Sequence, residues 1–484
     1  MEMAGNLQLD DIPECHSHEP GQFLLPGWCP LVHSVRFVRS SPSPDARTAF
    51  LIAGWLPSIL MLLVFALVSY YTATILYAIL TQHGLTSYTA IGRRAFGPQG
   101  VVAFRLVFLL DLFFTAASYL VLVSDSITTL YPRWTSAFVK MAIMTAVAPI
   151  TLIKDISVFS YGSVMGVLAL ASLVVVVVYD GLANPVSPGS LLAPAETSLL
   201  PPSTWVFPMS IGLLFEGFGC HAVLPEVLVE MKYKKSFNMM MAVCFAGCFA
   251  FYVAWGAIGY TMFGLLTLEN ISKNLATNAA FNVIVTKSML WLIGISFFTK
   301  FPIVMAPMNM DIEEVLRPWI NRVSDSPRIQ QFLVGTNRVI MAALVCIVTI
   351  VCPNFDTMMG ILGSFVSIST AILLICVSHL KLNNGWRIPF VRARRKPFLS
   401  KPEVSEILSP PAAVVRGHAG EKPKSIRILS TIGAGRRVIP AMASSEILLN
   451  WVLVAVGLVL AVVGTAWAVI EPRLDGIHHQ SSVI

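Results

Sequence analysis

The chain has 484 residues, of which 56% are hydrophobic and only 12% are charged, and its mean hydropathy is +0.74. Soluble globular domains carry about 25% charged residues. The composition therefore excludes an ordinary soluble protein and indicates an integral membrane protein. The net charge of +7 does not indicate nucleic-acid binding, because the basic residues cluster in short loops between apolar runs.

Ten apolar runs are long enough to cross a bilayer, for which a helix needs about 20 residues. In chain order they are 50–80, 101–130, 135–153, 157–179, 205–225, 237–263, 282–310, 331–352, 356–380 and 446–470. The predicted fold class is all-α integral membrane, with about ten transmembrane helices.

Alternate loops between these runs differ in basic content. One set holds 22 Lys and Arg, and the other holds 3. The basic set consists of 81–100, 154–156, 226–236, 311–330 and 381–445. The positive-inside rule places this set in the cytosol and the C-terminus on the other side. The sequon Asn270-Ile271-Ser272 falls in the non-cytosolic set.

Five segments follow from this layout. Residues 1–49 are a disordered or degenerate N-terminal segment without a recognisable cleavable signal peptide. Residues 50–380 form the transmembrane core, and residues 446–470 form the last helix. Between them, 381–445 is basic and rich in Pro, Ser and Gly, as in a disordered cytosolic loop. Residues 471–484 are a short non-cytosolic tail.

The strongest candidate for a functional site is the run 211–226, Ile-Gly-Leu-Leu-Phe-Glu-Gly-Phe-Gly-Cys-His-Ala-Val-Leu-Pro-Glu. A Gly-x-Gly inside a span allows the helix to unwind, and transporters use such breaks to bind substrates. Close helix packing through small residues is the alternative. Two ionisable residues in the run favour a site. The predicted substrate-binding residues are Gly217, Phe218, Gly219, Cys220 and His221.

Three ionisable residues within apolar runs are candidates for proton coupling, namely Glu216, His221 and Asp111. His221 could titrate between cytosolic pH and an acidic lumen, or could be a histidine hydrogen-bonded across the bundle, and the sequence favours neither. Asp111 lies near the centre of its run, where a carboxylate is costly unless it is functional or paired. Glu216 could carry a proton, or be paired with a buried lysine or the helix break.

A second irregular region is expected at 299–307, where Lys300 stands beside Pro302 and Pro307. The acidic residues that follow at 311–314 are interpreted as a solvated helix end. The chain has no metalloprotease, phosphate-binding or nucleophile-elbow motif and no zinc spacing of cysteines. No enzyme activity, cofactor or metal is therefore expected.

The run Gly217–Phe237 resembles the amino acid/auxin permease family, through His-Ala-Val-x-Pro followed by Met-Lys and Phe. More narrowly, it is similar to the vacuolar amino-acid transporters and the vesicular inhibitory amino-acid transporters. Supporting matches are Gly259–Gly264, Lys300–Glu314 and Gly92 to Gly97. The resemblance implies eleven helices, an inverted-repeat fold of the LeuT type and proton-coupled amino-acid transport.

Two departures from this resemblance bear on function. The first helix of the family carries a Gly-rich break and ends near Ala-Gly-Trp, and here only Ala53-Gly54-Trp55 matches. The first helix is thus expected to be missing or degenerate, which accounts for ten runs instead of eleven. The second departure is the long loop 381–445. We hypothesise that both are gene-model errors or splice variants.

The predicted function is a secondary transporter that moves neutral amino acids across a lipid bilayer, coupled to protons. The predicted location is the vacuolar membrane, with the plasma membrane as the alternative. A non-transporting or inactive receptor or sensor on the same fold is the alternative function. The sequence leaves open which amino acid is carried, and whether by symport or antiport.

Overall fold

The computed structural model describes residues 45–151, 160–202, 207–231, 233–264, 274–276, 281–324, 326–352, 355–383 and 443–481. Within these ranges the regular elements are all helices. The α-helices are α2 (Asp45–Ala53), α3 (Trp55–His83), α4 (Tyr88–Phe96), α5 (Pro98–Leu130), α6 (Ser136–Thr151), α7 (Ser160–Ala183), α8 (Phe207–Glu216), α9 (Leu224–Glu230), α10 (Phe237–Phe263), α12 (Val283–Val323), α13 (Pro327–Val351), α14 (Phe355–Ile361), α15 (Leu374–Leu382) and α16 (Ser444–Ser481). The predictions for 1–44 and 384–442, and the sequon at Asn270, fall outside the described residues.

Seven helices of the described chain are long and apolar enough to cross a membrane. They are Trp55–His83, Pro98–Leu130, Lys234–Phe263, Val283–Val323, Pro327–Val351, Asp356–Leu382 and Ser444–Ala468. Three shorter apolar helices are Ser136–Thr151, Ala171–Ala183 and Phe207–Val223. Together they correspond to the ten predicted runs, which confirms the all-α integral membrane fold.

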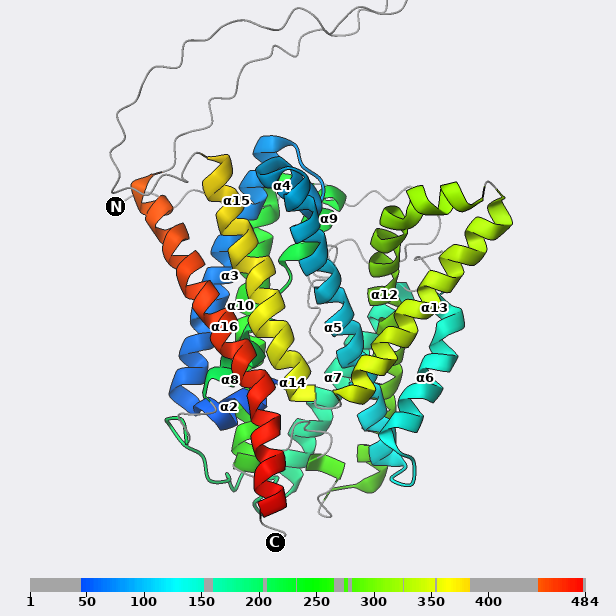
Figure 1. The fold of residues 1–484 in the computed structure, drawn as a ribbon. Helices are drawn as coiled ribbons and strands as arrows, with labels where there is room; N and C mark the ends of the chain where they lie inside the picture. Colours follow the sequence, from blue (N-terminus) through cyan, green and yellow to red (C-terminus); the bar gives the residue numbers. More distant parts are fainter. Residues whose placement is uncertain are drawn as a thin grey trace, which may run out of the picture.

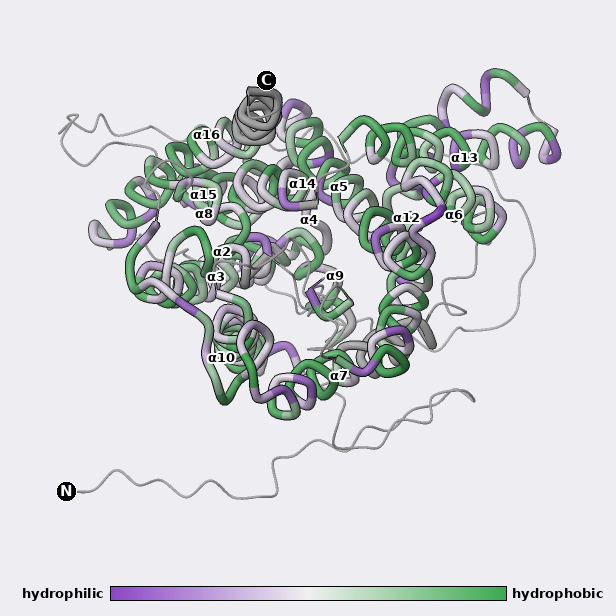
Figure 2. The backbone as a smooth tube through the Cα atoms, turned by 90° about the horizontal axis from the view of Figure 1, so that it is seen from below, coloured by the Kyte–Doolittle hydropathy of each residue, from purple (hydrophilic) through white to green (hydrophobic). Residues whose placement is uncertain are grey.

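The spans divide into two groups joined by α5. Figures 1 and 2 show α6, α12 and α13 together on one side, and α3, α8, α10 and α14 to α16 on the other. Helix α5 packs against α12, α6 and α13 of the first group and against α14 of the second. Hydrophobic residues predominate along the helical tube in Figure 2, as expected of a bundle whose outer surface meets lipid.

The elements of the predicted cytosolic loops gather at one end of the bundle. In Figure 1, α4, α9 and the connection from α12 to α13 all lie at the upper end, whereas α2 and the C-terminus lie at the lower end. Helix α4 is a short helix with Arg93 and Arg94 in its last turn, and Ser87 caps its N-terminus by accepting a hydrogen bond from the Ala90 amide at 3.2 Å. The loops with most basic residues therefore share one side of the fold.

The first predicted span, 50–80, is not one helix, and this prediction is corrected. Gly54 separates α2 from α3 with a φ of 76°, a conformation that favours glycine. The Trp55 and Leu56 amides, which have no partner within α3, donate to the carbonyl oxygens of Ser198 and Leu199, each at 3.1 Å. A Cβ on Gly54 would stand 2.8 Å from the Leu200 backbone. Helix α2 is thus a separate element, packed against α8 and α10.

The segment that binds α3 here is residues 189–200, which we call the strap. It is fixed to the end of α10 by three hydrogen bonds: Gly189 N–H to the Met262 oxygen at 2.6 Å, Ala195 N–H to the Thr261 oxygen at 2.9 Å, and Ser198 N–H to the Tyr260 hydroxyl at 2.8 Å. The strap therefore ties α10 to the junction of α2 and α3 across the lower end of the bundle.

Helix α12 passes through the irregular region expected at 299–307. It runs without interruption for 41 residues, with Pro302, Pro307 and Pro318 inside it. Each proline removes only one intrahelical donor, and neighbouring helices hold the chain on both sides of such a position in a membrane protein. Here α5 and α7 pack along α12. The prolines therefore do not end the helix.

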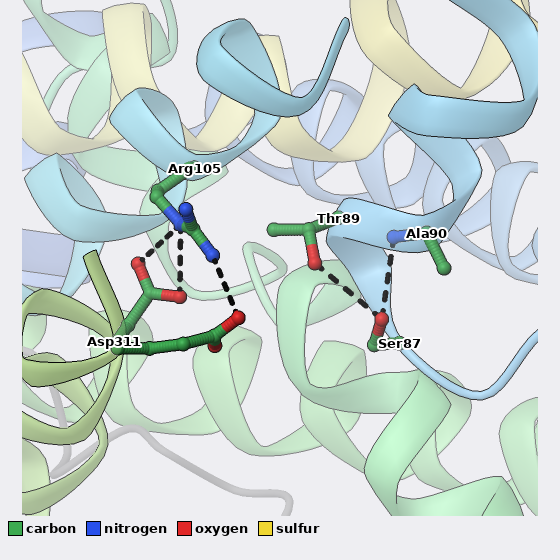
Figure 3. A network of polar contacts seen from close by, with 6 residues as sticks. Ser87, Thr89, Ala90, Arg105 and Asp311 are labelled. Carbon is green, nitrogen blue, oxygen red and sulfur yellow. Dashed lines mark hydrogen bonds and ion pairs between the residues drawn. The ribbon is translucent and has the colours of Figure 1, made fainter. Parts of the chain in front are cut away.

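The acidic residues after this region are not a freely solvated end. Figure 3 shows Arg105 of α5 reaching Asp311 of α12, with an N···O distance of 3.0 Å. The same guanidinium lies 3.6 Å from Glu314. Glu313 pairs with Arg338 of α13 at 2.6 Å. This carboxylate cluster joins α5, α12 and α13, which the charge pattern alone did not indicate.

Helices α6 and α13 are joined near both ends of α6 by cations that bind main-chain oxygens. Lys140 Nζ of α6 donates to the Thr349 oxygen near the end of α13 at 2.7 Å. Arg338 of α13 donates to the oxygen of Thr151, the last residue of α6, at 2.9 Å. A cation near a helix C-terminus is favourable because the last carbonyls have no intrahelical partner. The two helices therefore run antiparallel.

Candidate functional site

The predicted break in 205–225 is present. Helix α8 ends at Glu216, and α9 begins at Leu224 after a single 3-10 turn, His221–Val223 (η3). The Phe218 and Gly219 amides donate to the Phe215 and Glu216 oxygens at 3.0 and 2.9 Å, which pairs two of the carbonyls that α8 leaves at its end. The main chain between the two helices thus turns tightly without continuing the α-helix.

The two glycines of the break are required by close contacts and not by left-handed backbone angles, since neither is among the glycines with positive φ. A Cβ on Gly217 would stand 2.5 Å from the Tyr252 ring of α10. The Tyr252 hydroxyl also donates weakly to the Gly217 oxygen, at 3.4 Å. A Cβ on Gly219 would meet the side-chain oxygen of Ser367 and stand 2.7 Å from its Cβ.

A second irregular span lies opposite the break, and the sequence analysis missed it. Between α14 and α15 the chain forms two π-helical segments, Leu362–Ser367 (η6) and Ser369–Leu373 (η7). π-Helical turns are rare in proteins overall, but those that occur frequently lie at functional sites. The sequence signal that could have revealed it is the concentration of small and hydroxyl residues within 360–370.

The main chains of the two irregular spans touch through glycines. A Cβ on Gly212 of α8 would stand 2.5 Å from the Gly360 oxygen, and a Cβ on Gly363 of η6 would overlap the Gly212 oxygen. Small residues let membrane helices approach this closely. Helix α8 and the π-helical span therefore form one closely packed unit, with the break at its edge.

His221 is completely buried and is bound to α3. Its Nε2 atom lies 2.9 Å from the Thr72 hydroxyl and 3.1 Å from the Ser69 carbonyl oxygen. The Phe245 ring of α10 stacks on the imidazole, with centroids 6.1 Å apart. Nδ1 has no hydrogen-bond partner, and neither does the buried Ser69 hydroxyl. The histidine is thus hydrogen-bonded across the bundle on one side of its ring and has an unused polar atom on the other.

The other predicted residues of the break, Phe218, Cys220 and Glu216, differ from His221 in their contacts and burial. Phe218 is buried against Tyr252 and Phe245, and Cys220 is buried beside it, with its Sγ 3.6 Å from the Phe218 oxygen. Glu216, at the last position of α8, is partly exposed. Its position next to Gly217 places it at the break itself.

Asp111 lies in the middle of α5 and is 1% exposed. Its charge acts on Tyr88 of α4, whose pKa is raised well above its ordinary value by burial first and by Asp111 second. The Tyr88 hydroxyl donates to the Thr370 oxygen of η7 at 2.7 Å. Asp111 therefore belongs to the contact between α4, α5 and η7.

The arrangement combines a broken span, a facing π-helical span and a buried imidazole. Released main-chain groups in such a break can bind a carboxylate or an ammonium group, and the imidazole can exchange a proton. Within the described ranges, no group of three or more His, Cys, Asp or Glu side chains could hold a metal ion. Among the described residues, aromatic or hydroxyl side chains of other helices contact the break, including Phe245, Tyr252, Ser367 and Thr72.

Comparison with known proteins identifies the family of the chain. Residues 48–400 match the model of a family described as transmembrane amino acid transporter protein. The chain is 29% identical over 332 residues to the amino acid transporter AVT1C of Arabidopsis thaliana, covering 66% of this chain and 57% of the relative. Its identity to AVT1E of the same plant is 26% over 344 residues, covering 69% and 62%. The vesicular GABA transporter of Caenorhabditis elegans is 23% identical over 339 residues, covering 68% of this chain and 67% of that protein. The chain thus spans about three fifths of the length of the two plant relatives.

Proposed function

Because this chain belongs to the transmembrane amino acid transporter family, we propose that it carries amino acids across a membrane in exchange for, or together with, protons. The observation that carries the proposal is the break between α8 and α9, with the buried His221 at its end. Interrupted helices place main-chain groups at substrate sites in transporters, and a histidine changes its charge near physiological pH.

We propose that the substrate is a neutral amino acid. The contacts that other described helices make with the break are through aromatic rings and hydroxyls, and the carboxylate at the break, Glu216, is a candidate proton carrier. The amino and carboxyl groups common to all amino acids would compete for main-chain groups at 217–220, where the amides of Phe218, Gly219 and Cys220 donate within the turn in this conformation. Glu216 and Asp111 remain candidates for carrying the proton alongside His221, and Gly217, Phe218, Gly219 and Cys220 remain the proposed substrate contacts.

The compartment that we propose is the vacuolar membrane, with the plasma membrane as the alternative. This rests on the similarity of the His-Ala-Val-x-Pro run to vacuolar transporters. Imaging of the full-length chain with a fluorescent fusion beside a vacuolar-membrane marker tests it, and labelling confined to the cell surface would overturn it.

The transport proposal is tested with the full-length chain in liposomes under an imposed pH gradient. Labelled alanine, glutamine and γ-aminobutyrate should accumulate, and a protonophore should abolish the accumulation. Lysine and glutamate should accumulate less. Accumulation that survives the protonophore would contradict proton coupling, and better accumulation of a charged amino acid would contradict neutral selectivity.

A non-transporting sensor on the same fold is the second candidate. It is favoured by α2, whose nine residues extend only about 14 Å, roughly half of the hydrocarbon thickness. If α2 is all that the first helix contributes, one side of the substrate site is incomplete. Binding of a labelled amino acid without accumulation in the same liposomes would favour this candidate.

A further inference from the structure

The two nitrogens of His221 have different surroundings, and this determines which of them carries the proton. We infer that His221 is held as the tautomer with its proton on Nε2, that Thr72 is a positioning residue for this ring, and that Nδ1 is the atom that accepts a proton. The inference rests on the proposed function in that it names the proton-binding atom of the same site.

The Ser69 carbonyl oxygen is the first reason for this tautomer. It lies 3.1 Å from Nε2 and can only accept a hydrogen bond. An unprotonated Nε2 would place two lone pairs against each other in a buried site, whereas a protonated Nε2 donates to the oxygen. In the opposite tautomer, Nδ1–H would also be a buried donor without an acceptor, since Nδ1 has no partner.

The Thr72 hydroxyl gives the second reason. It lies 2.9 Å from Nε2, and it also lies 3.1 Å from the Val68 oxygen and 3.2 Å from the Ser69 oxygen of its own helix. A hydroxyl has one proton to donate and two lone pairs. When that proton goes to a main-chain oxygen of α3, a lone pair faces Nε2–H. Thr72 and Ser69 thus share the Nε2 proton and fix the orientation of the ring.

Nδ1 is then a lone pair inside the protein, in a residue that is 0% exposed. In this tautomer Nδ1 is the one ring nitrogen with a free lone pair, so a proton that reaches the ring binds here. The proton comes from the aqueous side, forms the Nδ1–H bond and gives an imidazolium whose Nε2–H still donates to α3, while the new Nδ1–H has no acceptor in this conformation. No group has to leave, because the Nε2–H bonds to α3 persist.

Few titratable groups face this ring from the elements packed around it. Cys220 in the break is the nearest along the chain, and Glu216 at the end of α8 and Glu226 in α9 are each five positions away. On α10, Cys248 and Tyr252 follow Phe245 on the same helix face. The face of α3 that carries Ser69 and Thr72 continues with apolar residues one turn away, and η7 contains no titratable residue.

The test is solid-state nuclear magnetic resonance of the full-length chain in lipid bilayers with 15N-labelled histidine rings. Subtracting the spectrum of His221→Gln identifies the His221 signals. At neutral pH, Nε2 should resonate as a protonated nitrogen and Nδ1 as an unprotonated one, and acidification should move only Nδ1 into the protonated range. A protonated Nδ1 in the neutral ring would overturn the inference.

Thr72→Ser and Thr72→Val form the matched pair. Thr72→Ser should keep the wild-type signals, and Thr72→Val should move the Nε2 signal and add a population with the proton on Nδ1. Identical spectra for the valine variant and the wild type would overturn the positioning role. If Thr72→Val does not fold, the wild-type and serine spectra still decide the tautomer. The tautomer is read without measuring transport, so absent uptake together with the expected spectra would contradict the proposed function alone.

Discussion

His221 Nε2 and the Thr72 hydroxyl are 2.9 Å apart, although 149 positions separate the two residues in the sequence. This contact fastens the broken span to α3 at the point where the α-helix is interrupted. It places the one buried imidazole of the break between two spans, so a change in its charge is felt by both. The contact therefore provides a direct physical route from proton binding to helix packing.

Replacing His221 by glutamine should reduce proton-driven uptake by at least tenfold, because the amide cannot take up and release a proton. Uptake in liposomes under a pH gradient is the measurement, with insertion checked by size-exclusion chromatography. The matched control is His83→Gln at the end of α3, which should transport normally. Full uptake by the His221 variant, with its dependence on the gradient retained, would remove His221 from the proton path.

Alanine at Gly219 should lower both thermal stability and uptake, since its Cβ would press against Ser367. Gly247 on α10 has open space around its Cβ position, so Gly247→Ala should be neutral or stabilising by up to about 1 kcal/mol. Thermal unfolding in detergent measures both. Adding Ser367→Gly to Gly219→Ala should restore much of the loss, and a double variant as unstable as Gly219→Ala would show that the contact does not explain the glycine.

The pair Arg338–Glu313 should contribute more to stability than the contact of Arg105 with Glu314. The Arg338 and Glu313 side chains are 8% and 15% exposed, whereas Glu314 is 69% exposed. Removing one partner of a buried pair leaves an uncompensated charge, so Arg338→Met should cost about 3 kcal/mol. Glu314→Gln should cost less than about 1 kcal/mol.

Unfolding midpoints of the two single variants and of Arg338→Met/Glu313→Gln decide this comparison. The double variant should be more stable than Arg338→Met alone, because no unpaired carboxylate is left. Equal losses for Arg338→Met and Glu314→Gln would mean that burial of the first pair does not govern its contribution.

Alanine at Gly54 should destabilise the fold through two effects, backbone strain and displacement of the strap. Its φ of 76° and ψ of 179° lie in a region used almost only by glycine, where strain costs about 1–3 kcal/mol. Gly84 also has a positive φ but has nothing within 4 Å of its Cβ position, so Gly84→Ala measures strain in a more tolerant region without a clash. The unfolding midpoint should fall further for Gly54→Ala. A smaller decrease than that of Gly84→Ala would contradict a role for the strap contact.

The sequence by itself determined the features that depend on local composition. Apolar runs of bilayer length predicted the ten spans, because lipid requires apolar side chains wherever a helix crosses it. The difference in basic residues predicted which loops share one end of the bundle. Glycines beside His221 predicted the interruption after Glu216, since a Gly-x-Gly within an apolar run allows a helix to unwind.

Only the tertiary structure decided the features that need a partner from a distant segment. The strap explains why the first run divides at Gly54, and Ser367 explains why position 219 has no side chain. Helix α12 continues through its prolines between the flanking helices α5 and α7, where the local sequence had indicated an irregular region. Hydropathy indicates whether a residue lies within the membrane, but it does not identify the residues that surround it. The contacts of His221 with α3 were therefore found only in the tertiary structure.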